Sequence, residues 1–210
     1  MSENKTYIKS FCTIQNNEII LNGESIFKTE PTLFSDFSKK AFRNLEIDYP
    51  KFFKMDNLSK LAFLGAELLL KNEIDNTKEN NIALVFANSS SSLDTDVKYQ
   101  KSISDKENYF PSPAVFVYTL PNICLGEISI RHQLRSENSF FIFEDFNPAF
   151  MKNYANVLLE TKKAEKVLCG WVEYFGEEYK AFLYLVALEG KTEHRKETLE
   201  ILYNKHSWKH

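Results

Sequence analysis

The residues of this chain whose types and spacing suggest chemistry meet at one turn, Glu144-Asp145-Phe146-Asn147-Pro148. An apolar run, residues 139–143, precedes the turn, and a helical pattern, residues 149–160, separates it from a second apolar run, residues 166–173. Strand, turn, helix and strand in this order predict a βαβ unit of a mostly parallel sheet. Ligands and reacting groups gather where a strand ends and the next helix begins, because the helix N-terminus attracts negative charge. Asp145 lies at that junction and is the leading candidate for a functional residue.

Asp145 also has a purely structural interpretation. Asn147 before Pro148 is typical of a helix N-cap followed by proline at the first helical position. An acidic residue near that end is favourable because of the helix dipole. Recognition of a ligand and stabilisation of the helix end are both open for this aspartate.

Three other patterns are weaker candidates. Ser89–Ser92 follow an apolar strand pattern, where a phosphate-binding loop would lie, but the run has no glycine or lysine, so a simple loop with Asp94 as helix cap is favoured. His206 and His210 have the spacing of a helical metal pair, yet they belong to a polar terminal stretch, and we expect no metal site. Glu127, inside an apolar helical pattern, is expected to be paired or exposed.

The cysteines suggest packing rather than chemistry. Cys12, Cys124 and Cys169 lie in apolar surroundings without the spacing of metal ligands, so we expect buried, reduced thiols. No disulfide framework is needed, because 210 residues with 43% hydrophobic side chains can bury a substantial core.

Charge and hydropathy exclude two classes of function. The net charge is −3 and no basic run is present, which argues against nucleic-acid binding. No apolar stretch approaches the roughly 20 residues of a membrane span. The polar start of the chain lacks the apolar core of a secretory signal, so a cytoplasmic protein is expected.

The remaining elements are those that must position the turn. The pattern predicts a hairpin near the start of the chain, two further helices and two further strands. In chain order these are the hairpin strands 7–14 and 18–21, a helix over 58–71 capped by Asp56, a strand over 82–87, a helix over 94–104, and a strand over 181–188 that is antiparallel to 166–173.

One long stretch carries a resemblance to a known family. The sequence PSPAVFVYTLPNICLGEISIRH, residues 111–132, then an apolar strand, a helix and CGWVEY, residues 169–174, resembles the N-terminal half of β-ketoacyl-acyl-carrier-protein synthases. These condensing enzymes have the thiolase-like fold. The resemblance implies matches to the family's motif helix at Asn122, Gly126, Ser129 and Ile130, and to a later glutamate at Glu173.

Counting along the family pattern from the motif helix and from Glu173 places the family's nucleophilic cysteine position at Asp145. A carboxylate is a weak nucleophile, whereas the family relies on a thiolate at a helix N-terminus. The catalytic histidines of the family belong to its second half, and no histidine here matches them. The resemblance therefore implies Asp145 as an inactive nucleophile position and Asn122, Gly126 and Ser129 as binding residues, with no cofactor and no metal.

The expected fold is α/β, a thiolase-like half with a five-stranded mixed sheet flanked by helices. Residues 1–190 would form the ketosynthase-like domain, and residues 191–210 a charged C-terminal tail.

The function implied is that of a ketosynthase-like, non-catalytic accessory subunit in fatty-acid, polyketide or aryl-polyene biosynthesis. Its partners would be acyl carrier protein or a full-length ketosynthase, in a homo- or heterodimer that pairs through Ser139–Phe143. Two alternatives are open: a small acyl-thioester hydrolase or acyltransferase that uses Asp145, and a purely structural interaction domain.

Overall fold

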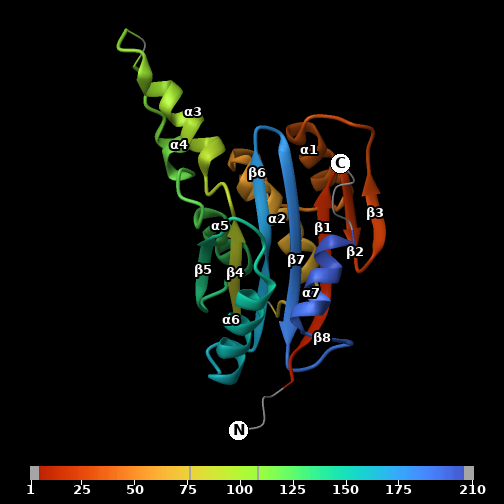
Figure 1. Cartoon of the computed structure of the whole chain (residues 1–210). Helices are drawn as coiled ribbons and strands as arrows, with labels where there is room; N and C mark the ends of the chain where they lie inside the picture. The colour runs from red at the N-terminus through yellow and green to blue at the C-terminus, as the bar shows by residue number, and fades with distance from the viewer. Residues whose placement is uncertain (1–4, 76, 108, 206–210) are drawn as a thin grey trace.

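The structure is a computed structural model that describes residues 5–75, 77–107 and 109–205. Within these residues eight strands form one mixed sheet, with helices on both faces (Figure 1). The strand order is β3-β2-β1-β7-β6-β4-β5, and β8 pairs with one end of β1. In chain order the elements are β1 (Tyr7–Gln15), β2 (Glu18–Leu21), β3 (Glu24–Lys28), α1 (Phe34–Asn44), the short 3-10 helix η1 (Pro50–Lys54), α2 (Asn57–Leu70), β4 (Ile82–Asn88), α3 (Leu93–Ser104), α4 (Pro113–Val117), α5 (Ile123–His132), β5 (Asn138–Ile142), α6 (Pro148–Glu160), β6 (Lys166–Phe175), β7 (Glu178–Ala187), β8 (Thr192–Glu193) and α7 (Lys196–Asn204).

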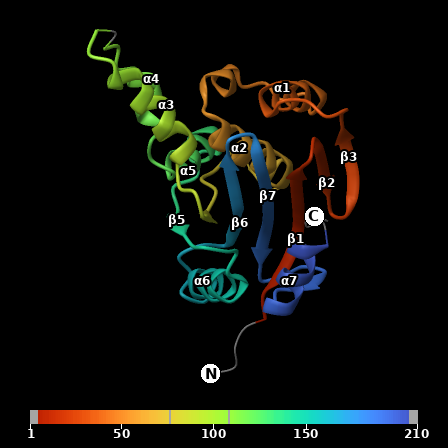
Figure 2. The ribbon, with the colours of Figure 1, turned by 45° about the horizontal axis from the view of Figure 1, so that its top comes forward.

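Two hydrophobic cores lie on opposite faces of the sheet. Helices α1, α2 and α5 cover one face, and α6 and α7 cover the other (Figure 2). Strand β4 is buried along its whole length, as expected for a central parallel strand. Its side chains alternate between the cores: Leu84 and Phe86 face α2, whereas Ala83, Val85 and Ala87 face α6.

The predicted βαβ unit is present. Strands β5 and β6 both pair in parallel with β4, one on each side, and α6 connects them across it. Strand β7 returns antiparallel to β6, with Lys166 opposite Ala187 and Phe175 opposite Glu178. The tight connection places Gly176 and Glu177 at positive φ, which a glycine tolerates without strain.

The α/β fold class is confirmed, but the sheet has eight strands rather than five. Six strand runs are predicted from the sequence, one more than the five expected in the sheet, and they correspond to β1, β2, β4, β5, β6 and β7. Strand β2 extends the same sheet beyond β1, and β3 extends it further. Strand β3 has no apolar alternation by which it could be predicted, because four of its five side chains are exposed. Strand β8 has only two residues, too few for a recognisable pattern.

The C-terminal segment packs onto the sheet. Residues 192–204, which the sequence analysis assigns to a charged tail, form β8 and α7. Leu199 of α7 is fully buried in the core that α6 shares. A domain boundary at residue 190 stays a prediction. His206 and His210, the weak metal candidates, lie outside the described residues.

Helices α3 and α4 project from the body beyond the end of the sheet (Figure 1). We call residues 93–107 and 109–117 the α3–α4 arm. Thr95 is the only described residue of these two helices that is buried. Large apolar side chains are exposed on the arm and just after it. They are Leu93, Val97, Tyr109, Phe110, Phe116, Val117 and Leu120. In the described part of the chain, no helix combines the length and apolar character that crossing a bilayer requires.

Candidate functional site

The turn around Asp145 begins where β5 leaves the sheet. The backbone N–H of Phe143 donates to the carbonyl of Asn88 at the end of β4, over 3.0 Å. The turn ends at a capped helix, since the N–H of Phe150 donates to the side-chain oxygen of Asn147 over 3.0 Å. The predicted cap at Asn147, with Pro148 as first helical residue, is therefore confirmed.

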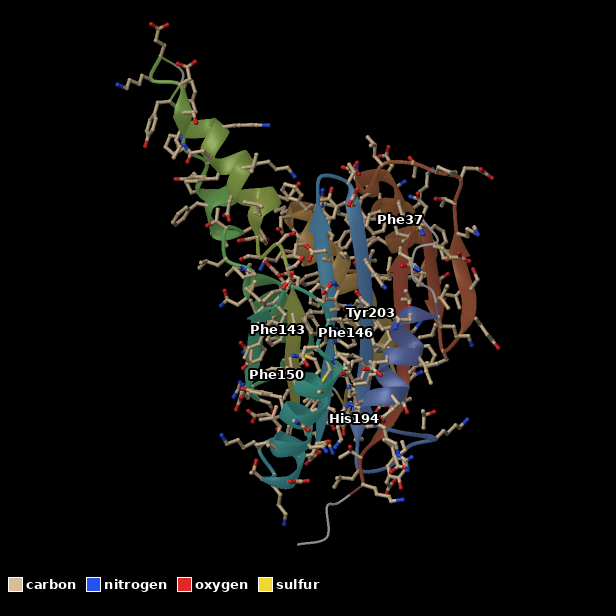
Figure 3. All side chains as sticks on the ribbon, in the orientation of Figure 1. Phe37, Phe143, Phe146, Phe150, His194 and Tyr203 are labelled. Atoms are coloured by element: carbon tan, nitrogen blue, oxygen red, sulfur yellow. The ribbon has the colours of Figure 1, made fainter. Side chains whose placement is uncertain are left out.

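Phe146 attaches the turn to the sheet. Its ring stacks on Tyr203 of α7, with centroids 4.6 Å apart, and meets the rings of Phe182 and Trp171 edge-on at 5.7 and 6.3 Å (Figure 3). Asp145 itself is exposed to solvent. Burial raises the pKa of Tyr203 to about 12, and the nearby carboxylates of Asp145 and Glu173 add to this rise. The phenol is therefore protonated at neutral pH.

Lys180 lies beneath the same aromatic cluster. It is directly opposite Glu173 in the β6–β7 ladder. Its Nζ lies 3.5 Å from the centroid of the Tyr203 ring and donates to the Tyr203 carbonyl over 3.2 Å. Burial lowers the pKa of Lys180 to about 8, so a fraction of this amine is neutral in mildly alkaline solution.

Glu173 holds the serine loop. One carboxylate oxygen accepts from the backbone N–H and hydroxyl of Ser89, over 2.7 and 2.6 Å, and from the N–H of Ser90 over 3.3 Å. The other oxygen is buried without a hydrogen-bond partner. The loop N–H groups that a phosphate would need are thus occupied by a side chain of the protein, in agreement with the simple-loop interpretation. Ser92, rather than Asp94, is the N-cap residue of α3.

The predicted binding residues do not join this cluster. Gly126 and Ser129 lie on α5, and Asn122 is the N-cap residue of that helix. Helix α5 packs against α2, on the opposite face of the sheet from α6. A Cβ atom on Gly126 would meet nothing within 4 Å, so close packing does not require glycine there. Asp145 and Glu173 both lie close enough to Tyr203 to raise its pKa. The three motif residues lie on the other face of the sheet, and their binding role stays a prediction.

The other candidates are structural in this fold. All three cysteines are free and buried, as predicted, and burial raises the pKa of each thiol. Glu127 is buried and paired: the Tyr118 hydroxyl donates to it over 2.9 Å, and Lys51 Nζ lies 2.8 Å from its other oxygen. Among the described residues, no group of histidine, cysteine and carboxylate side chains is placed to hold a metal ion.

The chemistry available at the Asp145 turn is limited. Three cavities, of about 410, 490 and 190 Å³, are present, and Asp145 lines none of them. The two histidines within the described ranges are engaged elsewhere: His132 lies 3.0 Å from Glu67, and His194 lies beside Thr6. The arrangement is an aromatic and charged cluster that anchors a turn to the sheet, with an exposed carboxylate at its tip.

Lys180 and Tyr203 are members of the cluster that local sequence patterns do not reveal. Lys180 is a charged residue at the start of an apolar strand, and Tyr203 follows Leu199 and Leu202 at helical spacing. That spacing predicts an amphipathic helix but does not say which face of the sheet it covers.

No protein-family model and no curated protein matches the chain. Solved structures do match. The ishigamide ketosynthase/chain length factor aligns with a TM-score of 0.65 at 16% identity, over 87% of this chain and 62% of that chain. The AntDE:AntF complex, a type II polyketide synthase acyl-carrier protein with its ketosynthase bound to the hexaketide, aligns with a TM-score of 0.62 at 16% identity, over 94% and 65%.

A third match differs in how much of its length is covered. A chain of the ketosynthase (ApeO)–chain length factor (ApeC) complex from Xenorhabdus doucetiae aligns with a TM-score of 0.60 at 13% identity, over 96% of this chain and 91% of that chain. This chain spans less than two thirds of the first two structures and most of the third. The predicted resemblance is thereby confirmed at the level of the fold: the chain has the thiolase-like fold of ketosynthases and chain length factors.

Proposed function

We propose that this protein is a non-catalytic, ketosynthase-like subunit that binds a full-length ketosynthase in polyketide or related acyl-chain biosynthesis. The observation that carries the proposal is the fold of a ketosynthase half combined with the chemistry of its turn. At the position that the sequence resemblance assigns to a nucleophile, the exposed Asp145 lines none of the three cavities described above, and neither histidine of the described residues contacts it. A base or nucleophile needs such neighbours to act on a thioester.

The size of the chain supports an accessory role. A unit of nearly this length is part of a ketosynthase–chain length factor complex, because this chain matches 91% of one chain there. A half-length unit with this fold is therefore compatible with assembly beside a ketosynthase.

Two features on one side of the molecule support a protein partner. Strand β5 is an edge of the sheet, and the α3–α4 arm extends from the same side (Figures 1 and 2). The N–H of Phe143 and the carbonyl of Glu137 point to β4, so by alternation Phe140 and Ile142 direct their backbone groups outward. An open edge beside exposed apolar side chains is a surface for strand pairing.

The test begins with purification of the tagged protein from its own cells and identification of what co-elutes. A recovered ketosynthase is then expressed, mixed with the chain and sized by light scattering. We expect a stable complex of defined stoichiometry. Recovery of this chain alone, as a homodimer without any ketosynthase or acyl carrier protein, would contradict the accessory role and favour the purely structural alternative.

A matched pair of variants localises the interface. Ile142, 50% exposed on the β5 edge, is replaced in Ile142→Asp, and Ile130, 63% exposed on α5, is replaced in Ile130→Asp as control. A charge on an edge strand opposes pairing. Ile142→Asp should weaken the complex at least about tenfold, and Ile130→Asp should leave it unchanged. Equal effects of both variants would place the interface elsewhere.

A further inference from the structure

The α3–α4 arm is attached to the body of the molecule mainly by polar contacts at its base (Figure 1). Thr95 is the only described residue of its two helices that is buried. Helices of 12 and 5 residues are marginal in water on their own, and a segment with few buried apolar contacts opens more easily than a core does. The direction of the arm therefore depends on the bonds that form where it leaves the sheet.

The chain enters the arm through the serine loop, residues 89–92. The buried Asn88 side chain donates to the carbonyl of Ser91 over 2.8 Å and accepts from its N–H over 2.9 Å. These two bonds fix Ser91 in the left-handed region, at φ 52°. The Ser92 hydroxyl donates to the carbonyl of Thr119 over 2.5 Å, so the segment that enters the arm is bonded to the segment that returns from it.

Glu173 connects this loop to the sheet. One of its carboxylate oxygens accepts all three bonds from Ser89 and Ser90. Hydrogen bonds to an ionised acceptor are about twice as strong as those between neutral groups. Because β6 pairs in parallel with β4, Glu173 reaches from the end of one strand to the loop that follows its neighbour. The start of the arm is thereby fixed relative to two central strands.

Two further carboxylates hold the first turn of α3. The Thr95 hydroxyl donates to Asp56 over 2.9 Å, and the other oxygen of Asp56 caps α2 by accepting from the N–H of Ser59. Asp94 accepts from the N–H of Gly176, in the turn between β6 and β7, over 3.3 Å. The arm is thus bonded to a strand, a turn and a helix end. Attachment to three different elements opposes rotation about any one of them.

We propose that Glu173 is a positioning residue: through the serine loop it sets the direction of the α3–α4 arm. It thereby fixes where the exposed apolar side chains of the arm lie relative to the β5 edge. The inference rests on the proposed function where it concerns the partner, a ketosynthase that contacts both surfaces together. Such a partner binds more tightly when the two surfaces are already in place, because less conformational freedom is lost on binding.

The first test measures the arm in the chain alone. Spin labels are attached at Lys101→Cys on α3 and Glu160→Cys on α6, both exposed positions, while the three native cysteines are buried. Pulsed electron resonance then gives the distribution of distances between arm and body. We expect one narrow distribution, which Glu173→Ala should broaden at least about twofold. Glu173→Gln keeps a neutral acceptor and should broaden it less.

Glu177→Ala is the matched control. Glu177 belongs to the same β6–β7 hairpin, but its carboxylate accepts from the N–H of Phe34 at the start of α1 and from the Tyr174 hydroxyl. Its loss should destabilise the protein without changing the distribution of arm distances. An unchanged distribution in Glu173→Ala, or equal broadening by Glu177→Ala, overturns the positioning role.

Hydrogen exchange provides a second measurement should Glu173→Ala fail to fold. In Glu173→Gln the amides of α3 should exchange at least about tenfold faster, because charge-assisted bonds at the base of the arm are weakened. The amides of α2, a helix of the main core, should keep their exchange rates. Equal acceleration in both helices would show general destabilisation and would contradict a specific effect on the arm.

The last test uses the ketosynthase recovered with the tagged protein. Glu173→Ala should weaken the complex at least about tenfold, and Glu177→Ala should leave its affinity unchanged. If the unaltered chain binds no ketosynthase, the proposed function fails, while the distance distributions still decide what Glu173 does to the arm. If Glu173→Ala broadens the distribution but binds as tightly as the unaltered chain, the direction of the arm does not matter to the partner, and the inference is overturned.

Discussion

The buried histidine makes a quantitative prediction about acid stability. The ordinary pKa of histidine is 6.5, and burial lowers that of His194 to about 4 in the folded protein. A histidine whose folded pKa is depressed stabilises the fold fully above pH 6.5, and this contribution is lost as the pH falls toward 4. With these two values, protonation of this one group makes the free energy of unfolding about 2 kcal/mol lower at pH 5 than at pH 8.

The assay is urea unfolding at pH 8, 6 and 5 in phosphate-free buffer, for the wild type and His194→Gln. Acid weakens both proteins through their carboxylates, so the difference between them isolates the histidine. The variant should be less stable at pH 8, because it disturbs the Thr6–Asn156 hydrogen bonds. Its disadvantage should shrink by about 2 kcal/mol at pH 5. Two stability curves that run parallel from pH 8 to pH 5 would refute the reasoning.

Two further perturbations have matched controls in the chain. A Cβ atom at Gly170 of β6 would lie 2.4 Å from the Phe182 carbonyl oxygen and 2.9 Å from Leu183 Cα, so Gly170→Ala should cost more than about 3 kcal/mol. Gly126→Ala, where a Cβ meets nothing, should stabilise α5 by up to about 1 kcal/mol in thermal unfolding, and a loss of stability there would reveal a constraint that packing does not show. Glu67→Gln breaks the contacts of Glu67 with Arg131 at 2.9 Å and His132 at 3.0 Å. Burial raises the pKa of Glu67, but hydrogen bonds from His132 and Arg131 outweigh it and lower the pKa overall; the contribution to stability is therefore lost in acid. The variant should lose about 2 kcal/mol at pH 7 and less below pH 4, whereas Glu79→Gln, in an exposed pair with Arg135, should change stability by less than about 0.5 kcal/mol.

The elements with strong local signals were predictable from the sequence. The apolar runs that became β4, β6 and β7 are buried along most of their length, and the cap at Asn147 needs only its own neighbours. The predicted helix start at residue 149 agrees closely with the observed start at Pro148. The strands predicted over 166–173 and 181–188 instead extend toward each other, to Phe175 and Glu178.

The rest depends on contacts between distant residues. Glu173 accepts from Ser89, 84 positions away, and nothing in either local pattern indicates that the loop is held by this carboxylate. Lys180 is covered by Tyr203 of α7, 23 residues later in the chain. His194 contacts Thr6, whose hydroxyl donates to Asn156 of α6, and neither partner is near it in the sequence. The Asp145 turn was located correctly, but the partners of Phe146 were not, because Tyr203 belongs to a helix that the sequence presents as a charged segment.

The position of β1 in the sheet has a consequence for synthesis on the ribosome. Tyr7–Gln15 forms a ladder with residues 180–187 of β7, so β1 leaves the ribosome about 170 residues before the strand with which it pairs. Until then the backbone groups of β1 that will pair with β7 are unpaired, and the core side chains of β1 are exposed. Nascent chains halted before residue 178 should therefore be captured by chaperones or proteases, and those released after β7 should escape them.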